Sequence, residues 1–175
     1  TNIEIAMKNI FSIYGDLSYL VKKDQINPAI HRINFVDFVR SRIEFFTQTA
    51  IKFKSKFEFI HKTDEIILDF NEIKLQRIVD NNLTNAIKYT LENETIYVVL
   101  KVHRADCDLI IESRSAQILD PQKIFEEYHR EEISKEGFGL GLNLVKRICN
   151  EENVGIKLES GENWASFTYT FKGVI

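Results

Sequence analysis

The sequence has few cysteines, little net charge and no long apolar run, and each of these absences excludes a class of protein. Its two cysteines, Cys107 and Cys149, stand far apart without metal-ligand spacing, which excludes a disulfide scaffold and fits a reducing cytosol. The formal net charge of -3 gives no reason to expect nucleic acid or an anionic membrane surface as a partner. No apolar run approaches the roughly 18 residues of a membrane-spanning helix.

The composition is that of an ordinary globular protein, with 44% hydrophobic and 28% charged residues among 175. This length is enough for one sizeable core, or for one domain with an appendage. The chain opens with Thr-Asn-Ile, already within a helical pattern. We therefore expect it to be a piece of a longer protein.

The clearest chemical pattern lies at 80–90, which reads DNNLTNAIKYT. Asn81 and Asn85 are four residues apart, and Lys88 follows three residues later, so all three share one face of a helix that begins near Asn71. Amide oxygens suit a hydrated Mg²⁺, and a lysine suits a phosphate chain. The alternative is an ordinary solvated helix face. Apolar residues occupy the other side: Ile73, Ile78, Val79, Leu83, Ala86 and Ile87.

Glycines are scarce, yet three of the seven fall within five residues, at Gly137, Gly139 and Gly141. They stand directly before a helical pattern that starts at Leu142. Glycines let the backbone approach a ligand closely, and a helix N-terminus offers unpaired N–H groups to an anion. A flexible turn at the start of a helix is the alternative. Together with the asparagine-rich helix, this pattern indicates two walls of a nucleotide site.

These motifs resemble those of the ATP-binding catalytic domain of sensor histidine kinases, in the Bergerat (GHKL) superfamily. The stretch 80–90 is similar to the N box of the family, IFEEYHR at 124–130 to its F box, and GFGLGL at 137–142 to its second glycine box. Their order and spacing match the family over roughly residues 33–171.

Strand and helix patterns are mixed without a βαβ rhythm, which predicts an α+β fold. Strands are expected at 31–34, 57–59 and 66–68, a hairpin at 95–102 and 108–111, and two more strands within 155–171. A core helix is expected at 35–50. The resemblance implies a two-layer α/β sandwich, in which three helices cover one face of a mixed sheet, preceded by one long helix from the dimerisation hairpin.

Residues 1–23 predict a helix with a heptad seam, because its apolar residues alternate in steps of four and three. Such a seam requires partner helices; the alternative is a helix that lies on its own domain. The resemblance implies that 1–23 is part of the second helix of a dimerisation and phosphotransfer hairpin, 24–32 a linker and 33–175 the catalytic domain. The seam residues are Ile3, Met7, Ile10, Tyr14, Leu17 and Val21.

The resemblance also implies roles for individual residues. Asn85 and Asn81 would bind Mg²⁺, and Lys88 and Arg130 would act catalytically at the phosphates of ATP. Tyr89 would flank the adenine, although a plain core position is the alternative for it. Arg130 could instead be a surface residue paired with a neighbouring glutamate. The backbone of the glycine box would complete the cofactor site through Gly137, Gly139, Leu140, Gly141 and Leu142.

Asn81 stands where members of the superfamily that hydrolyse ATP carry a glutamate. An amide cannot act as a general base. The domain should therefore hold ATP without hydrolysing it, which disfavours an ATP hydrolase.

Ser113 marks a departure from the family. The first glycine box, DxGxG, aligns with Ser113 to Gln117, so a serine replaces the aspartate that accepts the adenine amino group, and the glycines are absent. Glu112 cannot substitute for this aspartate, because neighbouring side chains of a strand point to opposite faces. Recognition of the adenine amino group would then rest on the neutral hydroxyl of Ser113, and ATP binding should be weaker.

The function implied is that of a histidine kinase catalytic domain. It would transfer the ATP γ-phosphate to a histidine on the dimerisation hairpin of a homodimer, for relay to an aspartate of a response regulator receiver domain. None of the four histidines precedes an acidic residue in a helix, so the acceptor would lie outside this sequence. The resemblance implies a cytoplasmic location, within a kinase anchored in the inner membrane. A degenerate pseudokinase, or scaffold for dimerisation and partner binding, is the alternative, favoured by the altered glycine box.

Overall fold

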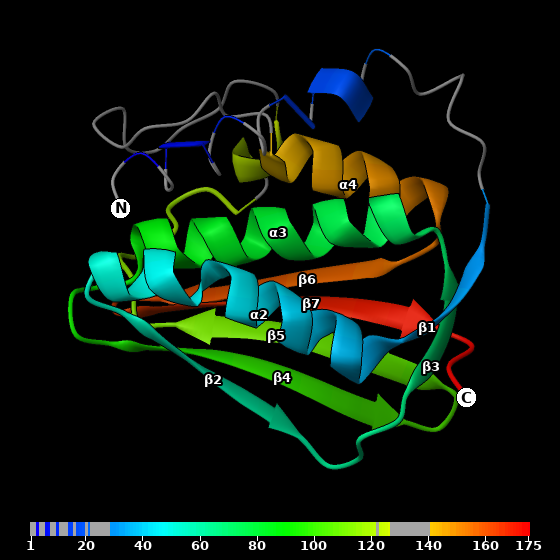
Figure 1. Cartoon of the computed structure of the whole chain (residues 1–175). Coiled ribbons are helices and arrows are strands. Elements are labelled where there is room, and N and C mark those ends of the chain that lie inside the picture. The colour runs from blue at the N-terminus through cyan, green and yellow to red at the C-terminus, as the bar shows by residue number, and fades with distance from the viewer. Residues whose placement is uncertain are drawn as a thin grey trace.

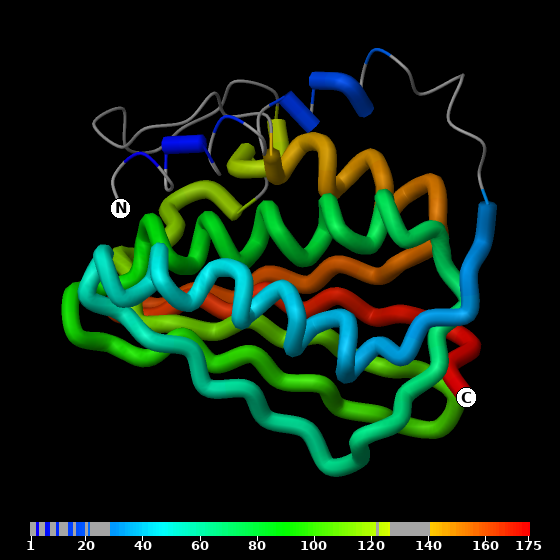
Figure 2. Tube along the Cα trace, in the orientation of Figure 1, coloured from blue at the N-terminus to red at the C-terminus, as the bar shows by residue number. Residues whose placement is uncertain are grey.

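The computed structural model describes residues 29–121, 123–126 and 141–175, together with positions 3, 6, 7, 10, 14, 15, 17–19 and 21. Three helices cover one face of a twisted sheet, and Figures 1 and 2 show these two layers. The helices are α2 (Phe35–Lys52), α3 (Glu72–Tyr89) and α4 (Gly141–Glu151), with a short 3₁₀ turn, η2 (Lys123–Phe125), before α4. This arrangement confirms the predicted α+β sandwich.

The main sheet has five strands in the order β2-β4-β5-β7-β6. Their bounds are β2 (Lys56–His61), β4 (Thr95–His103), β5 (Asp106–Ser113), β6 (Gly155–Gly161) and β7 (Trp164–Lys172). The pair β2 and β4 is parallel and the other neighbours are antiparallel, so the sheet is mixed, as expected. The predicted hairpin is β4–β5, which turns at Arg104 with φ 60°.

Two further strands, β1 (His31–Asn34) and β3 (Ile67–Phe70), form a separate antiparallel pair beside the helix layer. Strand β1 begins at His31, within the segment 24–32 that is expected to be a linker. Residues 22–28 lie outside the described residues. Phe171 of β7 joins this pair to the core, since its ring lies 4.9 Å from Phe35 and 5.6 Å from Phe70, both edge to face.

The core lies between the helices and the sheet and is made of alternate strand residues and one face of each helix. In β5, Cys107, Leu109, Ile111 and Ser113 face the helices, whereas Glu112 is exposed. The opposite orientation expected for Glu112 is therefore confirmed. None of the helices in the described part of the chain is long and apolar enough to cross a membrane.

The described N-terminal residues are helical and present two different faces. Tyr19 is only 4% exposed and belongs to the core cluster, and Gly15 lies against the guanidinium of Arg77 in α3. Burial raises the pKa of Tyr19, whose charged neighbours include Lys74 and Glu151. The six seam residues, in contrast, are between 48 and 81% exposed. Gly15 and Tyr19 thus contact the rest of the domain, while the six seam residues are exposed.

Candidate functional site

Helix α3 carries four of the predicted site residues, Asn81, Asn85, Lys88 and Tyr89. Asn71 caps its N-terminus, since the Asn71 side chain accepts a hydrogen bond from the Lys74 backbone N–H at 3.0 Å. Asn81 is buried at 7% exposure, while Asn85 and Lys88 are half-buried. The expected helix and its buried apolar side are present, but Ile73 is 46% exposed and does not belong to that side.

The two predicted walls of the site meet where Asn81 lies against Gly141, the first residue of α4. The Asn81 Nδ2 group donates to the Arg77 carbonyl at 2.9 Å, and the Oδ1 atom is directed at the glycine. A Cβ atom at position 141 would collide with this Oδ1 and lie 3.1 Å from the Asn81 Cγ. Only glycine permits this approach, so the structure joins the asparagine motif to the glycine motif.

The amide of Asn85, one turn beyond Asn81, forms no hydrogen bond with the residues that the structure describes. Two amide oxygens on one helix face, one of them directed at a helix N-terminus, are hard donors suited to Mg²⁺ together with phosphate and water. Within the described ranges, no group of three or more His, Cys, Asp or Glu residues could hold a metal ion. The residues present therefore fit a magnesium–phosphate group better than a carboxylate metal centre.

Lys88 and Tyr89 form the last turn of α3. The Lys88 Nζ atom lies 5.1 Å from the centroid of the Tyr89 ring, within cation–π range. Tyr89 is half-buried and does not belong to the buried core. A basic group and an aromatic ring thus share the C-terminal end of the helix.

Ser113 ends β5 on the helix-covered face and is 9% exposed. The loop that follows it is tied to the end of α3, because Thr90 forms a β-bridge with Ser115 and the Leu91 N–H donates to the Arg114 carbonyl at 2.9 Å. The Ser113 hydroxyl forms no hydrogen bond with the described residues. The loop therefore holds its position through backbone pairing, without the glycines of the family motif.

The glycine-rich segment and the F box are only partly described. Arg130, Gly137, Gly139 and Leu140 lie outside the described residues. Leu142 is half-buried at the start of α4. Phe125, the second residue of the F box, is 7% exposed, and its ring centroid lies 6.4 Å from that of Phe167. The Phe125 carbonyl accepts a hydrogen bond from the Asn143 side-chain amide at 3.1 Å.

The sequence pattern assigns no role to two polar residues of α3, Asp80 and Asn82, that are buried and form hydrogen bonds with other elements. Asp80 is 5% exposed and accepts hydrogen bonds from Arg42 in α2, and Asn82 is 3% exposed and accepts one from the Tyr169 hydroxyl at 2.8 Å. Both lie within the asparagine motif, but only their burial distinguishes them from solvated residues. The signal available from sequence was the density of polar residues in a helix with an otherwise apolar face.

Known proteins with similar sequence are consistent with this geometry. Residues 70–173, more than half of the chain, match the family described as histidine kinase-, DNA gyrase B-, and HSP90-like ATPase. The sensor histidine kinase YcbM of Bacillus subtilis is 29% identical over 98% of this chain and 56% of its own length. The sensor histidine kinase CusS of Escherichia coli is 25% identical over 97% of this chain and 36% of its own length.

Solved structures share the fold. The catalytic domain of histidine kinase ThkA superposes with a TM-score of 0.75 at 20% identity, covering 83% of this chain and 96% of that one. The structure of full-length ShkA superposes with a TM-score of 0.78 at 16% identity, and the superposition covers 95% of this chain and 36% of ShkA. The chain spans between 18 and 36% of the length of the first curated relatives. From the family match, the chain belongs to the histidine kinase-, DNA gyrase B- and HSP90-like ATPases, as an ATP-binding catalytic domain of the sensor kinase type.

Proposed function

We propose that this domain binds Mg·ATP and transfers the γ-phosphate to a histidine on a dimerisation helix, from which an aspartate of a response regulator receives it. The observation that supports this most is the contact between Asn81 and Gly141, because it unites the two motifs that would hold the metal and the phosphates. The relatives are sensor kinases, the ShkA structure is a complex with AMPPNP, and one ThkA structure is a complex with the response regulator protein TrrA.

We assign the site two ends. The phosphate end consists of Asn81, Asn85 and Gly141, whose amide oxygens and helix N-terminus would hold Mg²⁺ and the triphosphate. Lys88 would add a positive charge to the phosphates, and Arg130 would stabilise charge on the transferred phosphoryl group.

The base end consists of Tyr89, Ser113 and the loop 114–117, against which the adenine would lie. Ser113 would accept the adenine amino group directly or through a water molecule. The glycine-box residues Gly137, Gly139, Leu140 and Leu142 would complete the enclosure of the nucleotide.

A pseudokinase or scaffold is the second candidate, and the base end is the feature that favours it. The loop after Ser113 lacks glycines and could have filled the adenine pocket. However, Arg114, Ala116 and Gln117 are exposed, and the loop backbone is bonded to Leu91. Because these side chains are directed to solvent, the first proposal accounts better for the structure.

The direct test is a calorimetric titration with AMPPNP, carried out with and without Mg²⁺. We expect binding that strengthens when Mg²⁺ is added. No binding at millimolar nucleotide under either condition would favour the scaffold. A second test supplies radiolabelled ATP to the isolated domain. Because His31, His61 and His103 lie on strands and none has the acceptor pattern, we expect no acid-labile phosphohistidine.

The exposed seam of the N-terminal helix supports a homodimer, and the relatives suggest a cytoplasmic position in a membrane-anchored kinase. Lysines at Ile10 and Leu17, which are 64 and 48% exposed, should weaken self-association without unfolding the domain. Lysines at Ser41 and Gln48, two exposed positions of α2, provide the control. A parent protein that sediments as a monomer at high concentration would contradict the dimer.

A further inference from the structure

Asp80 directly precedes Asn81, yet the proposed chemistry does not use it. Its carboxylate is buried and accepts two hydrogen bonds from one guanidinium: Arg42 Nε lies 2.7 Å from Oδ1, and Arg42 Nη2 lies 2.8 Å from Oδ2. The Gln76 side chain donates a third hydrogen bond to Oδ2 at 3.1 Å. Two hydrogen bonds to one guanidinium fix the orientation of the Asp80 carboxylate as well as its distance from Arg42.

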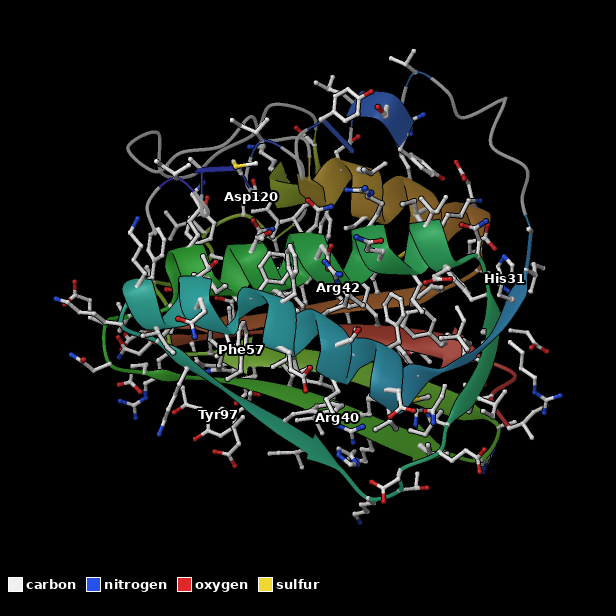
Figure 3. All side chains as sticks on the ribbon, in the orientation of Figure 1. His31, Arg40, Arg42, Phe57, Tyr97 and Asp120 are labelled. Atoms are coloured by element: carbon white, nitrogen blue, oxygen red, sulfur yellow. The ribbon has the colours of Figure 1, made fainter. Side chains whose placement is uncertain are left out.

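Arg42 is itself held in place. Its guanidinium lies 4.6 Å from the centroid of the Phe45 ring and 5.7 Å from that of Phe46, and its side chain is only 18% exposed. Figure 3 shows Arg42 between the ribbons of α2 and α3. A guanidinium stacked on a ring and forked onto a carboxylate loses little further freedom. The pair is therefore a rigid connection between the two helices.

The position of this connection determines where Asn81 points. Successive helix residues are rotated by about 100°, so fixing one residue fixes its neighbours. Asp80 is bonded to α2, Asn81 lies against Gly141 of α4, and Asn82 accepts from Tyr169 of β7. Three consecutive polar residues thus contact three different elements.

We infer that Arg42 and Asp80 are positioning residues, which set the rotation of α3 so that the amide oxygens of Asn81 and Asn85 face the metal and phosphates. The inference rests on the proposed function. A buried ion pair need not stabilise a fold, since apolar residues of similar volume often replace one without loss. Its role in orientation can therefore be separated from its role in stability.

The test is the double variant Arg42→Met/Asp80→Leu, which removes both charges and keeps the volume. We expect the thermal unfolding midpoint to change little, while affinity for AMPPNP in the presence of Mg²⁺ falls roughly 10- to 100-fold, the usual loss when partners of metal ligands are removed. Affinity without Mg²⁺ should be unchanged. In the nucleotide-free protein, the side-chain amide NMR signals of Asn81 should shift or broaden.

Thr170→Val is the control, because it removes a hydrogen bond to Asp108 between two strands of the sheet and does not involve α3. It should lower the unfolding midpoint and leave the Mg²⁺ dependence intact. If the double variant does not fold, Arg42→Lys serves instead, since it keeps the charge but not the fork, and it should lose part of the Mg²⁺-dependent affinity.

A parent protein that binds AMPPNP with Mg²⁺ dependence, alongside variants that retain that dependence, would overturn the positioning role alone. A parent without Mg²⁺ dependence would overturn the proposed function and this inference together.

Discussion

The phosphate end and the base end of the site are built by different means. At the phosphate end, side chains of α3 contact other elements directly, through Asn81 with Gly141 and through the neighbouring Asp80 with Arg42. At the base end, the contacts are between backbones, as in the bridge of Thr90 with Ser115. The first end therefore presents oriented polar atoms, whereas the second offers a fixed loop with a neutral hydroxyl.

This difference predicts how binding energy is distributed. A charge-assisted hydrogen bond is worth about 1.5–3 kcal/mol, and a neutral one about half as much. Without a carboxylate at Ser113, recognition of the base should be weak. Most of the affinity should then depend on Mg²⁺ and the phosphates, and each of the following predictions alters one end.

The largest effect is expected for Asn85→Ala, which removes an amide from the phosphate end. Because the Asn85 side chain is half-buried and forms no hydrogen bond with the described residues, the fold should be unaffected. Mg²⁺-dependent AMPPNP binding should be lost in calorimetry. The control is Asn150→Ala, an exposed position in α4. Unchanged affinity in the Asn85 variant would remove Asn85 from the metal site.

Gly141→Ala tests the contact between the two motifs. The added Cβ would collide with Asn81 Oδ1, so Asn81 must turn away, and we expect Mg²⁺-dependent affinity to fall by roughly tenfold or more. Gly155→Ala is the matched control, because a Cβ there lies 3.3 Å from Thr170 Cβ and far from α3. Equal binding by both variants would show that this contact does not organise the phosphate end.

Ser113→Asp alters the base end. The new carboxylate should accept the adenine amino group and strengthen ATP binding by roughly ten- to a hundredfold, with better discrimination against GTP. Glu112→Gln is the control, since Glu112 is exposed on the other face of the sheet. If neither the parent nor Ser113→Asp binds ATP at millimolar concentration, the result would favour the pseudokinase proposal.

The smallest expected effect is on the pH dependence of folding stability, through titratable groups buried in the core. Burial raises the pKa of Cys149 to about 12, and burial together with Asp108 raises that of Cys107 to about 12. Burial also raises the pKa of Tyr169. The folded state retains these protons longer than the unfolded state, so stability is full below the ordinary thiol value of 9.0 and falls as pH rises from there towards 12.

This prediction is checked by urea midpoints measured between pH 8 and about 10.5. Replacing both cysteines by alanine should flatten the decline. A decline that is equally steep in the double variant would assign the effect to other groups.

Local patterns in the sequence were sufficient to predict the helices and the β4–β5 hairpin, because helix periodicity and a hairpin turn depend on neighbouring residues. The parallel pairing of β2 with β4 and the separate β1–β3 sheet were not predicted. Such pairings join segments far apart in the chain, and alternation within one strand does not identify its partner.

For the candidate site too, the sequence was sufficient for residues related by local spacing but not for those whose partners come from distant elements. Asn81, Asn85 and Gly141 could be proposed as site residues because their spacing has a chemical reason. Asp80 and Asn82 were not, since the residues that give them a role, Arg42 and Tyr169, come from other elements.

The central claim, that Mg²⁺ and the phosphates are bound by Asn81, Asn85 and Gly141 while the base lies near Ser113, is tested most directly by NMR. AMPPNP is added first without Mg²⁺, and Mg²⁺ is added second. The account predicts that backbone amides near Ser113 respond to the first addition, and that the side-chain amides of Asn81 and Asn85 respond to the second. Asparagine signals that do not respond to Mg²⁺, in a protein that has bound the nucleotide, would contradict it.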